Sequence, residues 1–401
     1  MNTKKLTDDF TWVGTLDPEL RIFDIVVKTE HGSSYNSYLL QSDKANVLFE
    51  ASKEKFYDEY IDTVSNICPI ENIDYLVVSH TEPDHTGTIE RMLDLNPNLK
   101  VVLSFAANGF LKEIVNRDYD AMVVKDGDEI DLGNKTLKFI MAPNLHWPDT
   151  MFTYIPEEKI LVTCDAFGGH YCDEGITDDN LKDKDEYIEA VRFYFDSILA
   201  PFKKDVVNGY NKIKDLDIDI IANGHGPVIV ENPQEIIDLY KELAIDENPY
   251  KSPLVVIPYV SAYGYTKMLA EKISEGIQAA GDIEVRLHDM VYADQSVVLK
   301  ELQYSDGFLL GSPTMVGEAL EPIWEITGKM NAKMYGGKVA SAFGSYGWTG
   351  EAVPHLMQRL EQIKVKVYKD GLKFRFKPND DQLKEAYEFG KGFGEAVMGK
   401  G

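Results

Sequence analysis

Short apolar runs that end in polar side chains are the dominant pattern of the first 230 residues. Residues 73–78 are apolar and β-branched, which predicts a buried strand. The polar stretch 79–87 follows it, and residues 86–95 are typical of a helix. The same order of strand and polar loop recurs after residues 139–141, 159–164 and 218–222. Strand and helix are expected to alternate through residue 230, which fits layered sheets covered by helices.

The flanking segments predict further elements. Residues 10–50 contain short alternating segments, among them 20–27 and 37–40, which indicate a β-meander. Amphipathic helices are expected over 53–67 and 233–243.

A change of pattern near residue 250 divides the chain. Residues 246–253 are polar and interrupted by prolines, as in a linker. We therefore expect one domain over residues 1–250 and a second over 251–401. In the second domain the pattern predicts strands at 254–260, 307–312 and 338–344, and helices at 267–280 and 381–397.

Composition narrows the class of protein. The formal net charge of −26 over 401 residues excludes a general nucleic-acid binder and argues against binding to anionic membranes. The cysteines Cys68, Cys164 and Cys172 are not spaced as a disulfide framework or a metal motif, and Cys164 is expected to be a packing residue. No signal peptide or membrane-spanning run is evident, so a cytoplasmic protein is expected.

The loop after residue 78 concentrates potential metal ligands. His80, Glu82, Asp84 and His85 lie within six residues. In an extended loop the first three would point roughly the same way. The alternative is an acidic, solvated turn that carries two histidines by chance.

Three further ligands appear where other predicted strands end. His146 follows residues 139–141, Asp165 follows 159–164, and His225 follows 218–222. Strand ends can hold polar side chains rigidly at the rim of a sheet. A mixed set of imidazoles and carboxylates suits iron or manganese better than zinc.

The first strand of the second domain predicts a phosphate site. This strand is followed by a loop over residues 261–266 and then by a helix. The N–H groups at the helix N-terminus and the hydroxyls of the loop can face an anion. A capped helix start without a ligand is the alternative. Two more glycine-bearing loops follow the strands at 307–312 and 338–344, at the ends where open α/β sheets bind ligands.

Together, these motifs resemble a known family. The series His80, Glu82, Asp84, His85, His146, Asp165 and His225 resembles the metallo-β-lactamase fold, but Glu82 stands where the hydrolases usually have histidine. With the flavodoxin-like second half, the chain resembles the flavodiiron proteins, also called A-type flavoproteins. The resemblance implies an αββα sandwich followed by a doubly wound parallel sheet.

The resemblance also implies a ligand assignment. His80, Glu82 and His146 would bind one iron, Asp84, His85 and His225 the second, and Asp165 would bridge the two. FMN would lie among loops similar to those of flavodoxins, with Trp348 and Tyr346 as candidates for its aromatic face; Tyr265 departs from the asparagine common at its position. The implied FMN residues are Ser261, Ala262, Tyr263, Gly264, Tyr265, Thr266, Ser312, Pro313, Thr314, Met315, Val316, Gly317, Ser345, Tyr346, Gly347, Trp348 and Gly350.

The function implied by the resemblance is reduction of a diatomic gas. FMN would take electrons from a separate donor, such as rubredoxin or a reduced deazaflavin, because no rubredoxin-like centre is expected in the chain. A diiron site would then reduce dioxygen to water, nitric oxide to nitrous oxide, or both; the sequence does not choose between the gases. A head-to-tail homodimer, or a tetramer, would bring flavin and metals together. The alternatives are a metallo-β-lactamase-type hydrolase with a flavodoxin appendage, and an electron carrier.

The sequence leaves two alternative interpretations for Trp147 and for His170. Trp147 either walls the gas pocket or fills the core, and His170 either lies behind the metals or on the surface. His31 has no readable role, and His288 and His355 are expected to be ordinary structural or surface residues.

Overall fold

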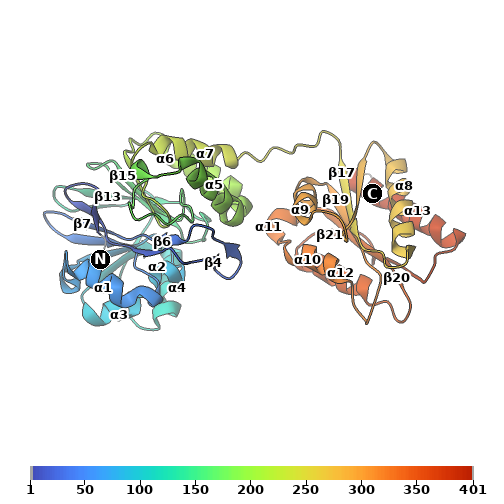
Figure 1. Cartoon of the computed structure of the whole chain (residues 1–401), viewed down its shortest axis with the longest axis horizontal. Helices are drawn as coiled ribbons and strands as arrows, with labels where there is room; N and C mark the ends of the chain where they lie inside the picture. Colours follow the sequence, from blue (N-terminus) through green and yellow to red (C-terminus); the bar gives the residue numbers. More distant parts are fainter. Residues whose placement is uncertain (1–2, 400–401) are drawn as a thin grey trace. The chain divides into compact units, whose positions relative to one another are not determined.

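The computed structural model describes residues 3–399, which form two compact units that divide between Asp246 and Glu247 (Figure 1). Each unit has its own sheets and its own apolar cores. Among the described residues, no helix has the length and apolar character needed to cross a bilayer.

Two sheets packed face to face form the centre of the first unit. The first has the order β1-β2-β7-β8-β9-β10-β11 and the second the order β12-β13-β14-β15-β16. Phe49 and Val77 of the first sheet share one buried core with Phe139 and Val162 of the second. The strands are β1 (Lys4–Lys5), β2 (Phe10–Trp12), β7 (Tyr38–Gln41), β8 (Asn46–Phe49), β9 (Tyr75–Val78), β10 (Lys100–Ser104), β11 (Asp120–Val124), β12 (Glu129–Asp131), β13 (Thr136–Met141), β14 (Met151–Ile155), β15 (Ile160–Cys164) and β16 (Ile220–Asn223).

Helices cover the outer face of each sheet. Tyr60, Met92 and Leu111 pack on the first sheet, whereas Val191 and Tyr240 pack on the second. The helices are α1 (Tyr57–Ser65), α2 (Pro83–Thr86), α3 (Ile89–Leu95) and α4 (Phe105–Val115), followed by α5 (Lys184–Tyr194), α6 (Lys203–Ile213) and α7 (Pro233–Leu243). The predicted αββα sandwich is confirmed.

The predicted alternation of strand and helix is wrong between residues 120 and 164. Here β11 to β15 follow one another without an intervening helix. Strands β12 to β15 are antiparallel neighbours, and short turns can connect antiparallel strands.

Residues 20–27, expected as one alternating segment of a β-meander, do not form one continuous strand. The segment forms a hairpin of β4 (Ile22–Phe23) and β5 (Val27–Lys28). Asp24 and Ile25 have φ of +45° and +69°, and this left-handed turn reverses the chain. A second pair, β3 (Thr15–Asp17) with β6 (Ser33–Tyr35), flanks this hairpin in sequence.

The second unit is a six-stranded parallel sheet covered on both faces. Its order is β18-β17-β19-β20-β21, with β22 also paired to β20. The strands are β17 (Leu254–Tyr259), β18 (Glu284–Asp289), β19 (Gly307–Gly311), β20 (Val339–Tyr346), β21 (Lys366–Val367) and β22 (Leu372–Arg375). Helices α8 (Tyr265–Ala280) and α13 (Asp380–Val397) share one core with the sheet, and α9 (Gln295–Tyr304), α10 (Glu321–Gly328), α11 (Ala332–Tyr335) and α12 (Ala352–Gln362) share the other. The predicted doubly wound sheet is confirmed.

Candidate metal centre and flavin cavity

The loop after β9 places its four polar residues in two groups. His80 and Glu82 precede Pro83, which is the first residue of the short helix α2. Proline is favoured at this position because its φ suits a helix start. Asp84 lies in this helical turn and groups with His85, so the loop is not extended and Asp84 does not group with His80 and Glu82.

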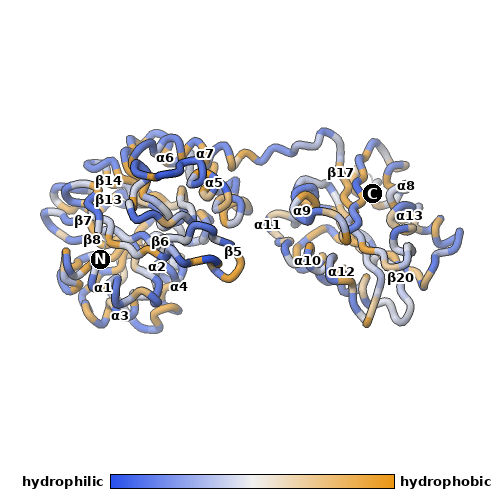
Figure 2. The backbone as a smooth tube through the Cα atoms, in the orientation of Figure 1, coloured by the Kyte–Doolittle hydropathy of each residue, from blue (hydrophilic) through white to orange (hydrophobic). Residues whose placement is uncertain are grey.

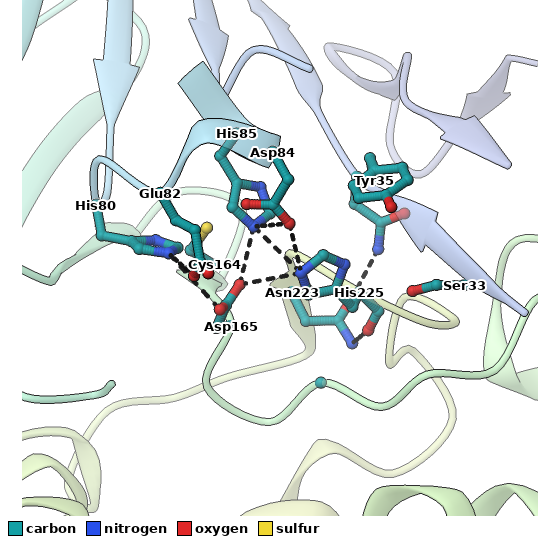
Figure 3. A network of polar contacts seen from close by, with 12 residues as sticks. Ser33, Tyr35, His80, Glu82, Asp84, His85, Cys164, Asp165, Asn223 and His225 are labelled. Carbon is teal, nitrogen blue, oxygen red and sulfur yellow. Dashed lines mark hydrogen bonds and ion pairs between the residues drawn. The ribbon is translucent and has the colours of Figure 1, made fainter. Parts of the chain in front are cut away.

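Paired strands bring the distant ligands to the same place. Strands β15 and β16 run parallel, with Cys164 opposite Asn223, so Asp165 and His225 leave neighbouring strand ends. His146 lies in the turn between β13 and β14. All seven residues predicted as ligands therefore meet at one edge of the sandwich. Figure 3 shows His80, Glu82, Asp84, His85, Asp165 and His225 pointing toward one another.

One group consists of His80, Glu82, His146 and Asp165. Glu82 Oε2 lies 3.3 Å from His80 Nε2 and 3.1 Å from His146 Nε2. Asp165 Oδ2 lies 2.8 Å from His146 Nε2. Separations of about 3 Å are those expected between ligand atoms that surround one transition-metal ion at about 2.1 Å.

The other group consists of Asp84, His85 and His225. Asp84 Oδ2 lies 3.5 Å from His85 Nε2 and 3.3 Å from His225 Nε2. Asp165 Oδ1 lies 3.0 Å and 3.4 Å from the same two nitrogens. The two oxygens of Asp165 thus face different groups, which is the geometry of a bridging carboxylate.

Hydrogen bonding shows that this arrangement suits cations. His225 Nδ1 lies 2.7 Å from the Ser34 carbonyl oxygen, so Nδ1 carries the proton that it donates and Nε2 keeps its lone pair. That nitrogen lies 3.2 Å from His85 Nε2. Both Asp84 oxygens and Asp165 Oδ1 are buried without a hydrogen-bond donor. Buried acceptors that face one another need a positive charge between them.

The pKa values of two ligand histidines also indicate that the site requires positive charge. Burial lowers the pKa of His85, but the carboxylates of Asp84 and Asp165 outweigh it and raise this pKa to about 10. His146 is likewise raised to a pKa of about 10, against burial, by hydrogen bonds to Asp165 and Glu82. In the absence of metal these imidazoles would hold protons where a metal ion would otherwise bind.

Several residues outside the predicted set support the centre. Asp149 Oδ2 accepts hydrogen bonds from the Thr81 N–H at 2.9 Å and hydroxyl at 2.8 Å, which ties the His80 loop to the His146 loop. Buried Glu50 accepts from the Ser79 N–H at 3.0 Å. Burial and the neighbouring Glu82 carboxylate raise the pKa of Asp24 to about 7. No motif marks Glu50 or Asp24 in the sequence.

The structure shows where His170 and His31 lie. His170 is 4% exposed, its ring lies 5.3 Å from that of His225, and its Nδ1 lies 2.9 Å from Ser33 Oγ, so the surface interpretation is wrong. Burial and the nearby His225 hold the pKa of His170 well below its usual range. His31 lies beside Tyr171 and Glu186 instead, and lines a cavity of about 330 Å³ together with His170.

Trp147 and Cys164 lie next to the ligands. The half-buried Trp147 ring is 6.1 Å from the His80 ring, which places it beside the metal centre and not in the core. Cys164 Sγ lies within 4.8 Å of ligand atoms of His80, His85 and Asp165. Burial and nearby carboxylates raise the pKa of the Cys164 thiol well above its usual range, so packing as a neutral thiol stays the prediction.

A cavity of about 310 Å³ lies at the strand ends of the second unit. Gly264 has a φ of +84° where the loop enters α8, a conformation that favours glycine. Most of the lining belongs to the predicted flavin residues, with Phe376 as an addition from the end of β22. The lining residues are Ala262, Tyr263, Tyr265, Pro313, Thr314, Met315, Val316, Ser345, Tyr346, Gly347, Trp348 and Phe376.

The other predicted flavin residues do not line this cavity. Thr266 Oγ1 lies 3.0 Å from Ser345 Oγ, Ser312 Oγ accepts from the Leu320 N–H, and Ser261 Oγ accepts from the Lys267 N–H. These hydroxyls hold the loops in place. Gly264, Gly317 and Gly350 all have positive φ in the same loops.

Aromatic and apolar side chains are exposed at the rim of the cavity. Tyr263, Val316 and Trp348 are 79%, 86% and 70% exposed. Flat apolar surface beside the N-terminus of α8 fits a ligand with an aromatic ring system and a phosphate, as FMN has.

The comparisons with known proteins agree with this geometry. Residues 34–226 match the family model described as ODP family beta lactamase, and residues 257–390 match Flavodoxin. The chain is 40% identical to the flavo-diiron protein FprA2 of Clostridium acetobutylicum over 98% of this chain and 99% of that protein. It is 35% identical to the anaerobic nitric oxide reductase flavorubredoxin of Escherichia coli over 95% of this chain and 79% of that protein.

The solved structure of the flavodiiron protein from Giardia intestinalis is also similar. It matches with a TM-score of 0.68 at 27% identity, covering 100% of this chain and 98% of that chain.

The raised histidine pKa values predict how stability depends on pH when metal is absent. Because the folded-state pKa values of His85 and His146 lie above the unfolded value of about 6.5, their stabilisation is complete below that pH and is lost as pH rises through about 10. The melting temperature of metal-free protein should therefore fall by several degrees between these pH values. Metal-loaded protein is the control and should change less; a flat or rising profile for the metal-free form would contradict the electrostatic argument.

The seven-ligand cluster, the flavin-sized cavity and the full-length likeness to FprA2 together identify the chain as a member of the flavodiiron protein family, also called type A flavoproteins.

Proposed function

We propose that this chain is an oxidoreductase that passes electrons from an external donor through FMN to a diiron site, where dioxygen is reduced to water, nitric oxide to nitrous oxide, or both. In this proposal residues 1–250 hold the iron pair and residues 251–401 hold FMN. The observation that carries it is Asp165, whose two carboxylate oxygens face two separate ligand groups.

The ligand chemistry supports iron. Glu82, Asp84 and Asp165 offer three negative charges that offset much of the charge of two metal ions, and hard oxygen ligands beside imidazoles suit iron or manganese. A hydrolase that activates water on zinc would need no flavin cavity. An electron carrier would have no use for crowded buried carboxylates, which destabilise a protein unless cations balance them.

The residues around the centre would orient the ligands. When bound, the iron pair would supply the redox chemistry that reduces a diatomic gas. The Ser34 carbonyl fixes the tautomer of His225, and Asp149 holds the loops of His80 and His146 together. Trp147 would form part of the wall of the gas pocket beside His80.

The name of one relative bears on the choice of gas. The Escherichia coli relative is named as a nitric oxide reductase, which favours nitric oxide as one substrate. A rubredoxin or a reduced deazaflavin would supply electrons, and the reducing cytoplasm is the expected location.

A direct assay tests this function. Protein made in iron-replete cells should contain two irons and one FMN per chain, and the reduced protein should consume dioxygen, nitric oxide or both. Metal and flavin analysis should accompany anaerobic reduction and side-by-side consumption of each gas. Zinc-filled, iron-free protein with full gas-reducing activity would contradict the proposal.

Electron transfer between the two cofactors points to a dimer. The metal ligands and the flavin cavity belong to separate compact units of the chain. We propose a head-to-tail homodimer, either alone or paired into a tetramer, in which the flavin of one copy serves the metals of the other. A two-fold arrangement would create both pairs through one repeated interface.

Complementation between inactive variants tests this dimer. One variant, His85→Ala with His225→Ala, should lose metal; a second, Gly264→Val with Ser345→Trp, should lose FMN by crowding the cavity and its loop. Co-refolded heterodimers contain one complete pair of sites, so they should regain up to about half of wild-type activity per dimer. Heterodimers that form but remain inactive would contradict the transfer between copies.

A further inference from the structure

One margin of the second unit is basic, although the chain as a whole is strongly acidic. Residues 364–377, which include β21 and β22, hold six of the 41 Lys and Arg residues of the chain but one of its 67 Asp and Glu residues. Figure 2 shows the central strands of this unit, around the label β17, in orange, which marks apolar segments. Strand β22 instead pairs with β20 at the margin of the sheet.

Two cations of β22 lie over aromatic residues that line the flavin cavity. Lys373 Nζ is 5.5 Å from the centre of the Tyr346 ring, and the Arg375 guanidinium carbon is 6.0 Å from the centre of the Phe376 ring. Tyr346 and Phe376 both line the cavity. The parallel pairing of β22 with β20 fixes this arrangement, because it sets Lys373 opposite Gly344 and Arg375 opposite Tyr346. One aromatic side chain therefore separates each cation from the cavity.

A hydrogen bond also holds Lys373 on the loop that follows β20. Its Nζ donates to the Gly350 carbonyl oxygen at 2.8 Å. Glu351 is the next residue, and a hydrogen bond from Thr349 and, less strongly, the charge of Lys373 lower the pKa of its carboxyl. Two cations, Lys373 and Arg375, therefore accompany one carboxylate beside this wall of the cavity, and the balance among the three is positive.

Protection of the sheet edge does not explain this placement. Charged residues on an edge strand discourage pairing with another sheet. Lys366 and Lys369 can serve that purpose at the same margin. Lys369 Nζ lies 5.0 Å and 5.8 Å from the ring centres of Tyr368 and Phe389, neither of which lines the cavity. Lys373 differs from Lys369 in the aromatic residue that it lies over.

We propose that Lys373 and Arg375 raise the reduction potential of the bound flavin. This inference rests on the proposed function, which places FMN in this cavity. The oxidised isoalloxazine ring is uncharged, and two electrons from the external donor with one proton from solvent convert it to an anion. A nearby positive charge stabilises the anion more than the neutral ring, so the two cations favour the reduced form.

The exposure of both cations limits the size of the effect. Lys373 and Arg375 are exposed to solvent, so water and salt screen part of their charge. We therefore expect the two charges together to change the preference for reduced over oxidised FMN by about tenfold. A higher potential makes the flavin a better acceptor for electrons from the donor.

A double substitution tests the proposal on the full-length protein. In Lys373→Met with Arg375→Met, the FMN midpoint potential, followed at the flavin absorbance in anaerobic spectroelectrochemistry, should fall below the wild-type value. The expected tenfold change corresponds to about 30 mV for a two-electron couple. The dissociation constant of reduced FMN should rise about ten times more than that of oxidised FMN. A purely structural defect would weaken both forms alike and leave the potential unchanged.

Matched variants separate charge from structure. Lys369→Met removes a similar exposed cation from the same margin and should keep the wild-type potential. Lys373→Gln retains a donor for the Gly350 carbonyl without the charge, so its potential should equal that of Lys373→Met. High salt should reduce the difference between wild type and the double variant. A wild-type potential in Lys373→Gln together with a lowered one in Lys373→Met would assign the effect to the hydrogen bond and overturn the proposal.

Charge reversal keeps the proposal testable even where the double variant fails to fold. Lys373→Glu changes one exposed side chain and should lower the potential further than Lys373→Met does. A potential equal to that of wild type in Lys373→Glu would overturn the proposal.

The remaining outcomes distinguish this inference from its alternatives. An unchanged potential, with reduction that is slower by rubredoxin but not by dithionite, would overturn it in favour of a docking site for an acidic electron donor. Wild-type protein that binds no FMN would contradict the proposed function instead.

Discussion

The crowding of three carboxylates and four imidazoles in one buried site is the constraint on which the first unit depends. Asp84 and Asp165 have buried oxygens without a donor, and His85 and His225 turn nitrogens toward each other at 3.2 Å. Without cations, only protons could relieve this arrangement. The ligand atoms form two groups that meet at Asp165, so two metal ions balance the site more fully than one.

Several strands of the first unit end at the same edge of the sandwich, and the ligand residues follow these strand ends. Parallel pairing of β15 with β16 sets Asp165 beside His225, and the helical turn that begins at Pro83 separates Asp84 from Glu82. Contacts from distant loops then fix side-chain orientation. Asp149 and Ser34 are examples, since each accepts a hydrogen bond that holds a ligand or its loop.

The sequence predicted the layered fold and the flavodoxin-like sheet because apolar strands and amphipathic helices leave clear patterns. It identified candidate ligands because each combines a suitable side chain with a position after a strand. Prediction from the sequence failed where contacts between distant residues determine the local structure. The hairpin at Asp24 resembled a strand, since its apolar residues alternate as a strand's do. Burial of His170 depends on Phe23 and Tyr194, and Phe376 reaches the cavity only through the pairing of β22 with β20.

The central claim is that Asp165 joins two irons in one site, and magnetic coupling tests it most directly. Mössbauer spectra of the oxidised, iron-enriched wild-type protein in an applied field should show two ferric ions coupled to a diamagnetic ground state. Asp165→Ala, which removes the shared carboxylate, should lose iron or weaken that coupling while the flavodoxin-like unit keeps FMN. Two uncoupled ferric ions in wild type, or full and unchanged coupling in Asp165→Ala, would contradict the account.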